Sequence, residues 1–204
     1  DRAFKGGRHG GDIQGIRDHL DYIAGMGFTT IWSCPVIENQ QPEYSYHGYS
    51  TTDFYRIDPR MGSLEDYKAL SAEANDKGVK LVMDQIMNHI GSGHWWVQDH
   101  PSSDWVNNAW EYKWNKHYRS TIHDPYSASE DSLSMTDGWF VESMPDLNQR
   151  NPLLAKYLIQ NSIWWVEEAD LSGIRMDTYP YSDKNFMADW SCAVMKEYPN
   201  FNIV

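Results

Sequence analysis

Hydrophobic positions recur at helical or strand spacing along the first half of the chain. Isoleucines and leucines three or four apart after Asp12 predict one helix over 12–26. A β-branched and aromatic run then predicts a buried strand over 28–34, and a polar, tyrosine-rich loop follows over 38–58. A start of capping-box type predicts a helix over 63–75, and an apolar run predicts the next strand over 79–84.

The periodic pattern is lost from residue 90 to about 149 and then returns. This irregular segment is too long for a plain loop, which indicates an inserted subdomain. Beyond it we expect a helix that opens at 151–152, a strand over 171–177, a helix over 182–198 and the start of a strand at 201–204.

Alternating helices and strands predict an α/β fold with a parallel sheet, either a barrel or a doubly wound sheet. No glycine-rich phosphate-binding motif follows any strand, which argues against a nucleotide-binding protein. A complete (β/α)8 TIM barrel takes about 250 residues, and roughly 145 remain here without the insertion. We therefore expect about half a barrel, in which 1–89 and 151–204 are barrel and 90–150 is an irregular insertion. On this interpretation the chain is a fragment of a longer enzyme that begins after the first strand and stops within the fifth.

Composition narrows the class of ligand. Lys and Arg number 17 against 29 acidic residues, a net charge of −12, so we expect no nucleic-acid partner. Aromatic residues make up 14% of the chain, and six of the ten tryptophans fall in the insertion: Trp95, Trp96, Trp105, Trp110, Trp114 and Trp139. Amphipathic rings beside many carboxylates suit a neutral, hydroxyl-rich ligand such as a sugar. They suit an aromatic core equally well, and composition alone does not separate the two.

Other features set limits on localisation and cofactors. No apolar window is long enough to span a membrane. Cys34 and Cys192 are too few for a disulfide framework or a zinc site, and we expect both to be buried core residues. The start at Asp1 resembles the middle of a protein, so the absence of a leader says nothing about the compartment, which stays open between cytoplasm and periplasm. No organic cofactor is expected.

Polar side chains stand where the predicted strands end. Asp84 closes one strand and leads into His89, while Arg175 and Asp177 are two residues apart and so point to the same face of another. The loop over 46–49 adds a histidine and tyrosines. Because working residues in parallel barrels lie at the carboxyl ends of the strands, this set predicts a sugar-cleaving site.

Each of these residues also has a structural explanation. Asp84 could cap the turn after its strand, and Arg175 and Asp177 could form an ordinary ion pair. The histidines and Tyr49 could be satisfied interior residues. A structural explanation is plausible for any one of these residues. It is less plausible that all of them stand at strand ends by coincidence, which favours a functional site.

Four segments in order resemble the short motifs of the α-amylase family of retaining glycoside hydrolases. They are YHGYSTTDFYRID (46–58), DQIMNH (84–89), MPDLN (144–148) and GIRMD (173–177). The match covers the whole chain, with the insertion corresponding to that family's B domain. MPDLN resembles members intermediate between oligo-1,6-glucosidases and the neopullulanase/cyclomaltodextrinase group.

The resemblance implies catalytic roles for two residues and a supporting role for a third. Asp177 would be the nucleophile that forms a covalent glycosyl-enzyme. Arg175 would keep it ionised, since a permanent positive charge lowers the pKa of a neighbouring carboxyl group. Asp84 would be structural support. The acid/base glutamate, and a later aspartate that stabilises the transition state, would lie beyond Val204, so the fragment alone should be inactive.

Three further residues would bind substrate on this resemblance. His89 would donate hydrogen bonds to hydroxyls of the sugar at the cleavage point. Tyr49 would stack beneath that same ring, and His47 would line the site. The segment 178–181 reads TYPY where long-chain α-amylases carry a Lys–His pair, which puts an endo-amylase in doubt.

A calcium ion is the one metal that the resemblance suggests. Gly10 and Asp12 resemble half of a calcium site near the barrel start of the neopullulanase group, where a backbone carbonyl and a carboxylate act as hard oxygen ligands. Asp12 as a plain helix N-cap is an equal alternative, and both can hold together.

We therefore expect a hydrolase of α-glucans that acts on maltooligosaccharides, cyclodextrins or pullulan. An oligo-1,6-glucosidase or a transglycosylase on the same scaffold is the alternative among enzymes, and a non-catalytic carbohydrate-binding relative is the alternative of another class. The full-length protein could form a homodimer. Among the six tryptophans of the insertion, we expect at least one on the cleft wall over Asp177.

Overall fold

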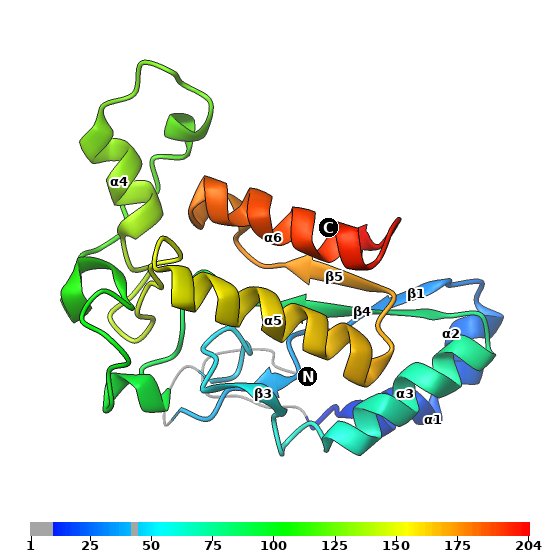
Figure 1. Ribbon diagram of the computed structural model, residues 1–204. Helices are drawn as coiled ribbons and strands as arrows, with labels where there is room; N and C mark the ends of the chain where they lie inside the picture. The colour runs from blue at the N-terminus through cyan, green and yellow to red at the C-terminus, as the bar shows by residue number, and fades with distance from the viewer. Residues whose placement is uncertain (1–9, 42–44) are drawn as a thin grey trace.

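The computed structural model describes residues 10–41 and 45–204. Residues 1–9 lie outside this description, as do residues 42–44, which belong to the expected tyrosine-rich loop. Its centre is a four-stranded sheet in the order β1 (Thr30–Trp32), β4 (Lys80–Gln85), β5 (Gly173–Met176) and β6 (Asn202–Ile203) (Figure 1). All three pairings are parallel. Each strand adds to the same edge as the chain proceeds, without the reversal of order that defines a doubly wound sheet.

Three long helices connect these strands as the sequence predicts. They are α3 (Leu64–Asp76), α5 (Pro152–Ala169) and α6 (Lys184–Glu197). α3 packs against α5 and α5 against α6, so the helices follow one another around the sheet (Figure 1). Each begins at a side-chain cap: Ser63 forms the predicted capping box with Asp66, and Asn151 and Asp183 accept backbone N–H groups of the first turn.

The N-terminal helix is interrupted, so the prediction of one helix over 12–26 is wrong. The structure has α1 (Ile13–Asp18) and α2 (Leu20–Gly25). His19 between them leaves the helical region with φ −110° and ψ 8°. Its ring Nδ1 donates to the carbonyl of Gly15 at 2.8 Å. Periodicity is preserved across the break, which is why the pattern alone did not reveal it.

β1 is shorter and more exposed than predicted. Only three residues are strand, and Phe28 and Trp32 are 58% and 55% exposed, so the prediction of a buried strand is wrong. The physical reason is that β1 lies at the edge of the described sheet.

The prediction that both cysteines are buried is also wrong, since both are exposed. Cys34 lies beyond the end of the edge strand β1. On α6, Trp190 and Val194 face the core, and Cys192 between them lies on the opposite side of the helix.

The predicted loop over 38–58 contains a short antiparallel ribbon. β2 (Ile37–Glu38) pairs with β3 (Asp53–Ile57) around an irregular register. Phe54 and Ile57 on β3 are buried. Polar neighbours hide this short alternation in the sequence, which explains the missed strands.

The segment 90–150 has little regular structure, as expected. It contains three single-turn helices, η1 (Trp95–Val97), η2 (Asn107–Trp110) and η3 (Arg119–Ile122), and one α-helix, α4 (Ser129–Asp137). In Figure 1, α4 stands away from the sheet. Two isolated bridges, His89 with Asp146 and Val106 with Leu147, tie the ends of the segment together near the end of β4.

The core is rich in large rings, and two of its buried indoles have a partner for their N–H group. Trp165 and Trp190 are fully buried. Their indole N–H groups donate to the carbonyl of Phe54 and to Oγ of Ser162, each at 2.8 Å. Buried indoles stabilise a fold when their N–H finds such a partner. Within the described ranges, no helix combines the length and apolar character that a membrane crossing requires.

Candidate active site

Arg175 joins two buried carboxylates at the carboxyl ends of β4 and β5. Its Nη1 donates to Oδ1 of Asp84 at 3.0 Å and to Oδ1 of Asp177 at 2.7 Å. The register of the sheet brings them together, because Asp84 pairs with Arg175 across the two strands. We call Asp84, Arg175 and Asp177 the carboxylate cluster.

The three charged side chains of the carboxylate cluster are largely shielded from solvent, so they interact strongly with one another. The side chain of Asp84 is fully buried, that of Asp177 is 10% exposed and that of Arg175 is 26% exposed. Burial raises the pKa of Asp84, and the positive charge of Arg175 opposes that rise. Removing the charge of Arg175 would leave two buried carboxylates without compensation, which is costly in a poorly solvated site.

Asp84 is committed to accepting hydrogen bonds. Its Oδ2 accepts from the indole of Trp32 at 3.0 Å, from the hydroxyl of Tyr49 at 3.2 Å and from Nη1 of Arg175 at 3.2 Å. Every partner is a donor, which favours the ionised form of Asp84. The residue thus holds three elements in place around Asp177.

Trp32 is a site residue that sequence analysis missed. It ends β1, donates to Asp84, and its ring lies 5.2 Å from the guanidinium carbon of Arg175, a cation–π distance. Its position near the end of a predicted strand, like that of Asp84 and Asp177, could have indicated a role in the site. Its position inside an apolar run made it look like core.

His89 lies beside the cluster as a buried, neutral ring. It is 2% exposed, and its Nε2 lies 2.8 Å from the carbonyl of Tyr49, to which it donates. Burial lowers the pKa of His89, whereas the charge of Asp177 acts in the opposite direction. The ring of Phe140 packs edge-on at 5.3 Å.

Tyr49 and His47 form the loop side of the site. The ring of Tyr49 lies 5.9 Å from the guanidinium carbon of Arg175 and stacks on His47 at 6.0 Å. Nδ1 of His47 accepts the backbone N–H of Tyr49 at 2.9 Å, which fixes the turn. Burial raises the pKa of Tyr49, so its hydroxyl stays protonated and donates to Asp84.

The backbone turns sharply straight after Asp177. Thr178 has φ 47° and ψ 34°, in the left-handed region, and η4 (Tyr179–Tyr181) follows. This conformation costs a β-branched residue about 1–2 kcal/mol. Such strain is typical of functional sites, and here it ends the strand with the Asp177 side chain at the cluster.

Asp146 of the MPDLN segment anchors the insertion to the site. It is 2% exposed, and its two oxygens accept from the side-chain amides of Asn88 and Asn107 at 2.8 Å each. Burial raises the pKa of Asp146 well above its usual range. Sequence analysis used this segment only for the family resemblance and gave Asp146 no role.

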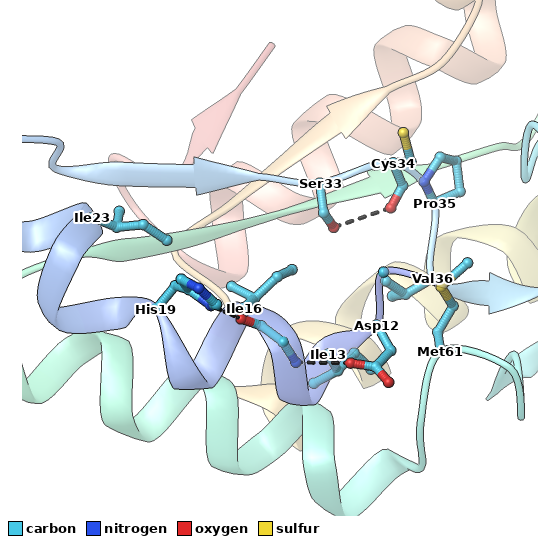
Figure 2. Close-up of a pocket in the computed structure, with 12 residues that line it drawn as sticks. Asp12, Ile13, Ile16, His19, Ile23, Ser33, Cys34, Pro35, Val36 and Met61 are labelled. Carbon is cyan, nitrogen blue, oxygen red and sulfur yellow. Dashed lines mark hydrogen bonds between the residues drawn. The ribbon is translucent and has the colours of Figure 1, made fainter. Parts of the chain in front are cut away.

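The residues suggested for calcium lie apart from the cluster, at the start of α1. Oδ1 of Asp12 accepts the backbone N–H of Gly15 at 2.7 Å, which is the N-cap alternative, and Gly10 has φ 85°. Asp12 borders an almost wholly apolar pocket between α1 and the residues after β1 (Figure 2). Among the described residues no three His, Cys, Asp or Glu side chains form a metal-binding group. One carboxylate and one carbonyl fall short of the six to eight oxygens that calcium takes, so these residues alone do not make a calcium site.

The structure therefore brings together six residues selected from the sequence and leaves two elsewhere. The six are Asp84, Arg175, Asp177, His89, Tyr49 and His47, and the two are Gly10 and Asp12. Retaining glycoside hydrolysis needs two carboxyl groups about 5–5.5 Å apart, a nucleophile and an acid/base. Asp177 can serve as the first, and Asp84, saturated with donors, is unsuited to the second.

Comparison with known proteins identifies the family. The α-amylase catalytic domain matches residues 2–198. Among curated proteins, the chain is 35% identical to a β/α-amylase of Paenibacillus polymyxa over 91% of its length, and 32% identical to a cyclomaltodextrinase of Geobacillus thermopakistaniensis over 96%. It spans only 15% and 31% of those two proteins.

Solved structures agree in fold. An α-amylase from Geobacillus thermoleovorans, solved with acarbose, superposes with a TM-score of 0.81 at 35% identity, covering 97% of this chain and 40% of that one. An Anoxybacillus α-amylase superposes with a TM-score of 0.82 at 35% identity, covering 96% of this chain and 39% of that one. The chain therefore belongs to the α-amylase family and contains part of its TIM-barrel catalytic domain.

Proposed function

We propose that the chain carries the nucleophile side of the active site of a retaining α-glucan hydrolase. The observation that supports this most is the bridge from Arg175 to Asp177 and Asp84, with Tyr49 and His89 beside it. A mere ion pair would need only two of these residues. The proposal concerns the full-length protein, since the chain spans about a third or less of its curated relatives.

Asp177 is the nucleophile in this mechanism. It attacks the anomeric carbon as the glycosidic bond breaks, which gives a covalent glycosyl-enzyme that water later hydrolyses. Arg175 donates a hydrogen bond to one oxygen of Asp177 and so orients the carboxylate, which leaves the other oxygen to attack. Asp84 positions Arg175 and does not react.

His89, Tyr49 and His47 bind the sugar at the cleavage point. Nε2 of His89 donates to the carbonyl of Tyr49, so Nδ1, 3.5 Å from the side-chain amide of Asn88, accepts from a sugar hydroxyl rather than donating to it. The ring of Tyr49 offers an apolar platform to the same glucose unit. His47 supports Tyr49 through the turn it stabilises. The acid/base is proposed to be a residue other than Asp84, because Asp84 is occupied as an acceptor.

The substrate class is an α-linked glucan such as a maltooligosaccharide, a cyclodextrin or pullulan. Relatives named cyclomaltodextrinase and intracellular maltogenic amylase, 31–32% identical over 96% of this chain, support that choice. Residues 90–150 are proposed as the inserted B domain, since Asp146 ties them to the barrel beside His89. Calcium at Gly10 and Asp12 stays a prediction that needs further ligands.

A covalent trap tests the proposal directly. The full-length protein is treated with a maltosyl fluoride fluorinated at the ring position that slows deglycosylation, then digested and analysed by mass spectrometry. The expected result is one added glycosyl group on the peptide that contains Asp177, absent from Asp177→Asn. Label on another carboxylate, or α-glucan turnover without any trapped species, would contradict the proposed role.

A further inference from the structure

A second hollow opens in the 90–150 segment, away from the carboxylate cluster. Its volume of about 580 Å³ falls within the range of small-molecule sites. Rings and polar groups share its lining, which includes His100, Trp110, Tyr112, Trp139, Glu142 and Ser143. We call it the Trp110 pocket.

The aromatic wall of the Trp110 pocket is built and fixed. The rings of Trp110 and His100 stack at 3.8 Å with an interplanar angle of 3°. The indole N–H of Trp110 donates to the carbonyl of Ser102 at 3.3 Å, and Nε2 of His100 donates to the carbonyl of Val97 at 3.1 Å. Both rings are therefore held in one orientation before any ligand arrives.

The backbone that carries Trp110 has a strained conformation. Asn108, Ala109 and Trp110 all have left-handed φ angles, of 61°, 51° and 67°. Asparagine tolerates this region, but alanine and tryptophan do not adopt it without cost. The run is held by Asn108, whose amide donates to the carbonyl of Asp137 at 2.7 Å. Strain of this kind persists where a surrounding structure imposes it, most often at functional sites.

The polar groups of the Trp110 pocket are accessible to a ligand. Glu142 and Tyr112 are exposed, and Ser143 is half-buried. Within the described part of the chain, the Glu142 carboxylate, the Tyr112 hydroxyl and the Ser143 hydroxyl form no hydrogen bond or ion pair. An acidic acceptor without a cation disfavours an anionic ligand. Rings with hydroxyl and carboxylate groups suit glucose units, which have apolar C–H faces and many hydroxyls.

The Trp110 pocket is distinct from the proposed cleavage site. Phe140 contacts His89 at the cluster, whereas its neighbour Trp139 lines the pocket. In the described ranges, no lining side chain makes a hydrogen bond, ion pair or ring contact with the carboxylate cluster.

We propose that the Trp110 pocket is a second α-glucan-binding site, which holds part of a long substrate chain while another part is cleaved. The ligand class rests on the proposed function, and the site itself rests on its own geometry. Truncating the pocket should impair long glucans more than short ones, because only a long chain can occupy both sites at once.

Calorimetric titration with maltoheptaose tests this on full-length Asp177→Asn, which cannot consume the ligand. We expect two binding events, of which adding Trp110→Ala removes one. The matched control is Trp95→Ala, an exposed tryptophan of the same segment outside the pocket, which should leave both. Glu142→Gln and Tyr112→Ala are surface changes that should each weaken the second event at least threefold, and they decide the matter if Trp110→Ala does not fold.

Turnover separates this inference from the proposed function. With Asp177 intact, Trp110→Ala should keep kcat/KM for maltotriose within twofold and lower that for soluble starch at least threefold. A single binding event that Trp110→Ala, Glu142→Gln and Tyr112→Ala leave unchanged would overturn the second site. Equal loss on maltotriose and starch would place the pocket in the cleavage site and also overturn it. A protein that cleaves no α-glucan but loses a maltoheptaose event with Trp110→Ala would refute the proposed function alone.

Discussion

Nη1 of Arg175 donates a 2.7 Å hydrogen bond to Oδ1 of Asp177, two residues further along the same chain segment. The same nitrogen contacts both oxygens of Asp84, at 3.0 and 3.2 Å. One cation thus compensates two buried anions, and the balance of the site depends on it.

Replacing Arg175 by Met should therefore destabilise the protein strongly. Two buried carboxylates would be left without a cation, at a cost of about 3–5 kcal/mol in the free energy of unfolding. Adding Asp84→Asn should recover part of that loss, because one uncompensated charge is removed. Urea unfolding of the single and double variants measures both effects.

Arg17 provides the matched control for Arg175. It pairs with Glu73, whose side chain is 42% exposed. Arg17→Met should cost about 0–1 kcal/mol, as surface pairs do. If Arg17→Met and Arg175→Met lower the free energy of unfolding equally, Arg175 compensates its buried carboxylates no more than a surface arginine compensates its partner.

Asp177→Asn should abolish turnover while keeping the fold and the binding of sugar. The amide has the shape of the carboxylate but cannot act as a nucleophile, so kcat should fall to less than about 3% of the wild-type value. Asp189→Asn changes an exposed acid on α6 and should leave kcat unchanged. Steady-state hydrolysis of a maltooligosaccharide checks this, and substantial residual turnover in Asp177→Asn would remove it from the nucleophile role.

Two substitutions of Tyr49 separate its ring from its hydroxyl. Tyr49→Phe keeps the platform and loses only the 3.2 Å hydrogen bond to Asp84, which has two other donors, so kcat/KM should change by less than about fivefold. Tyr49→Ala removes the platform and should lower kcat/KM by about 10–100-fold, or 1.4–2.8 kcal/mol. Similar losses in both variants would assign the role to the hydroxyl rather than to stacking.

Acid should destabilise the fold through His94. Burial lowers the pKa of His94 to about 3. The unfolded chain has the ordinary value of about 6.5, so between these values only the unfolded state binds the proton, and stability falls as the pH falls. The slope should reach about 1.4 kcal/mol per pH unit for this one residue below about pH 6.

His94→Asn is the test of that slope. Nδ1 of His94 accepts the backbone N–H of Trp96 at 3.1 Å, and an asparagine oxygen can accept the same bond without titrating. Urea unfolding at pH 7, 6 and 5 should show a shallower fall with acid in the variant, by about one proton's contribution. Identical pH dependence in the two proteins would show that His94 is not the source.

The three long helices α3, α5 and α6 and the ends of β4 and β5 were predictable because local signals specify them. Ser63 and Asp66 form the capping box that their spacing predicts, and Asp84 and Asp177 meet because parallel strands end at one edge of a sheet. Local sequence patterns were therefore enough to predict the order of the long helices and central strands, and that Asp84, Arg175 and Asp177 lie at the ends of those strands.

Features that depend on distant neighbours were not predictable. The exposure of Cys34 follows from the edge position of β1, and the role of Trp32 follows from contact with Asp84, 52 residues away. The strained run at 108–110 leaves no local signal, because alanine and tryptophan favour other conformations.

Trp114 is the tryptophan of the insertion that best fits a cleft-wall role. Trp96, Trp105 and Trp139 are buried, Trp110 is half-buried, and Trp95 and Trp114 are 53% and 58% exposed. The ring of Trp114 contacts His117 at 6.1 Å, and His117 stacks on Phe140, which packs against His89. This chain of rings leads from Trp114 to the cleavage site, whereas Trp95 packs on His94 and Trp96.

Trp114→Ala should therefore raise KM for maltohexaose about fivefold and change kcat by less than about twofold. Stacking remote from the scissile bond stabilises the bound ground state and the transition state alike, so its loss appears in KM. Trp95→Ala, equally exposed but outside this chain of rings, should change neither constant. Steady-state kinetics on the full-length protein gives both values. If Trp114→Ala lowers kcat and leaves KM unchanged, the ring acts on the reacting centre and not on a remote glucose unit. If neither constant changes, Trp114 is a surface residue without a part in substrate binding.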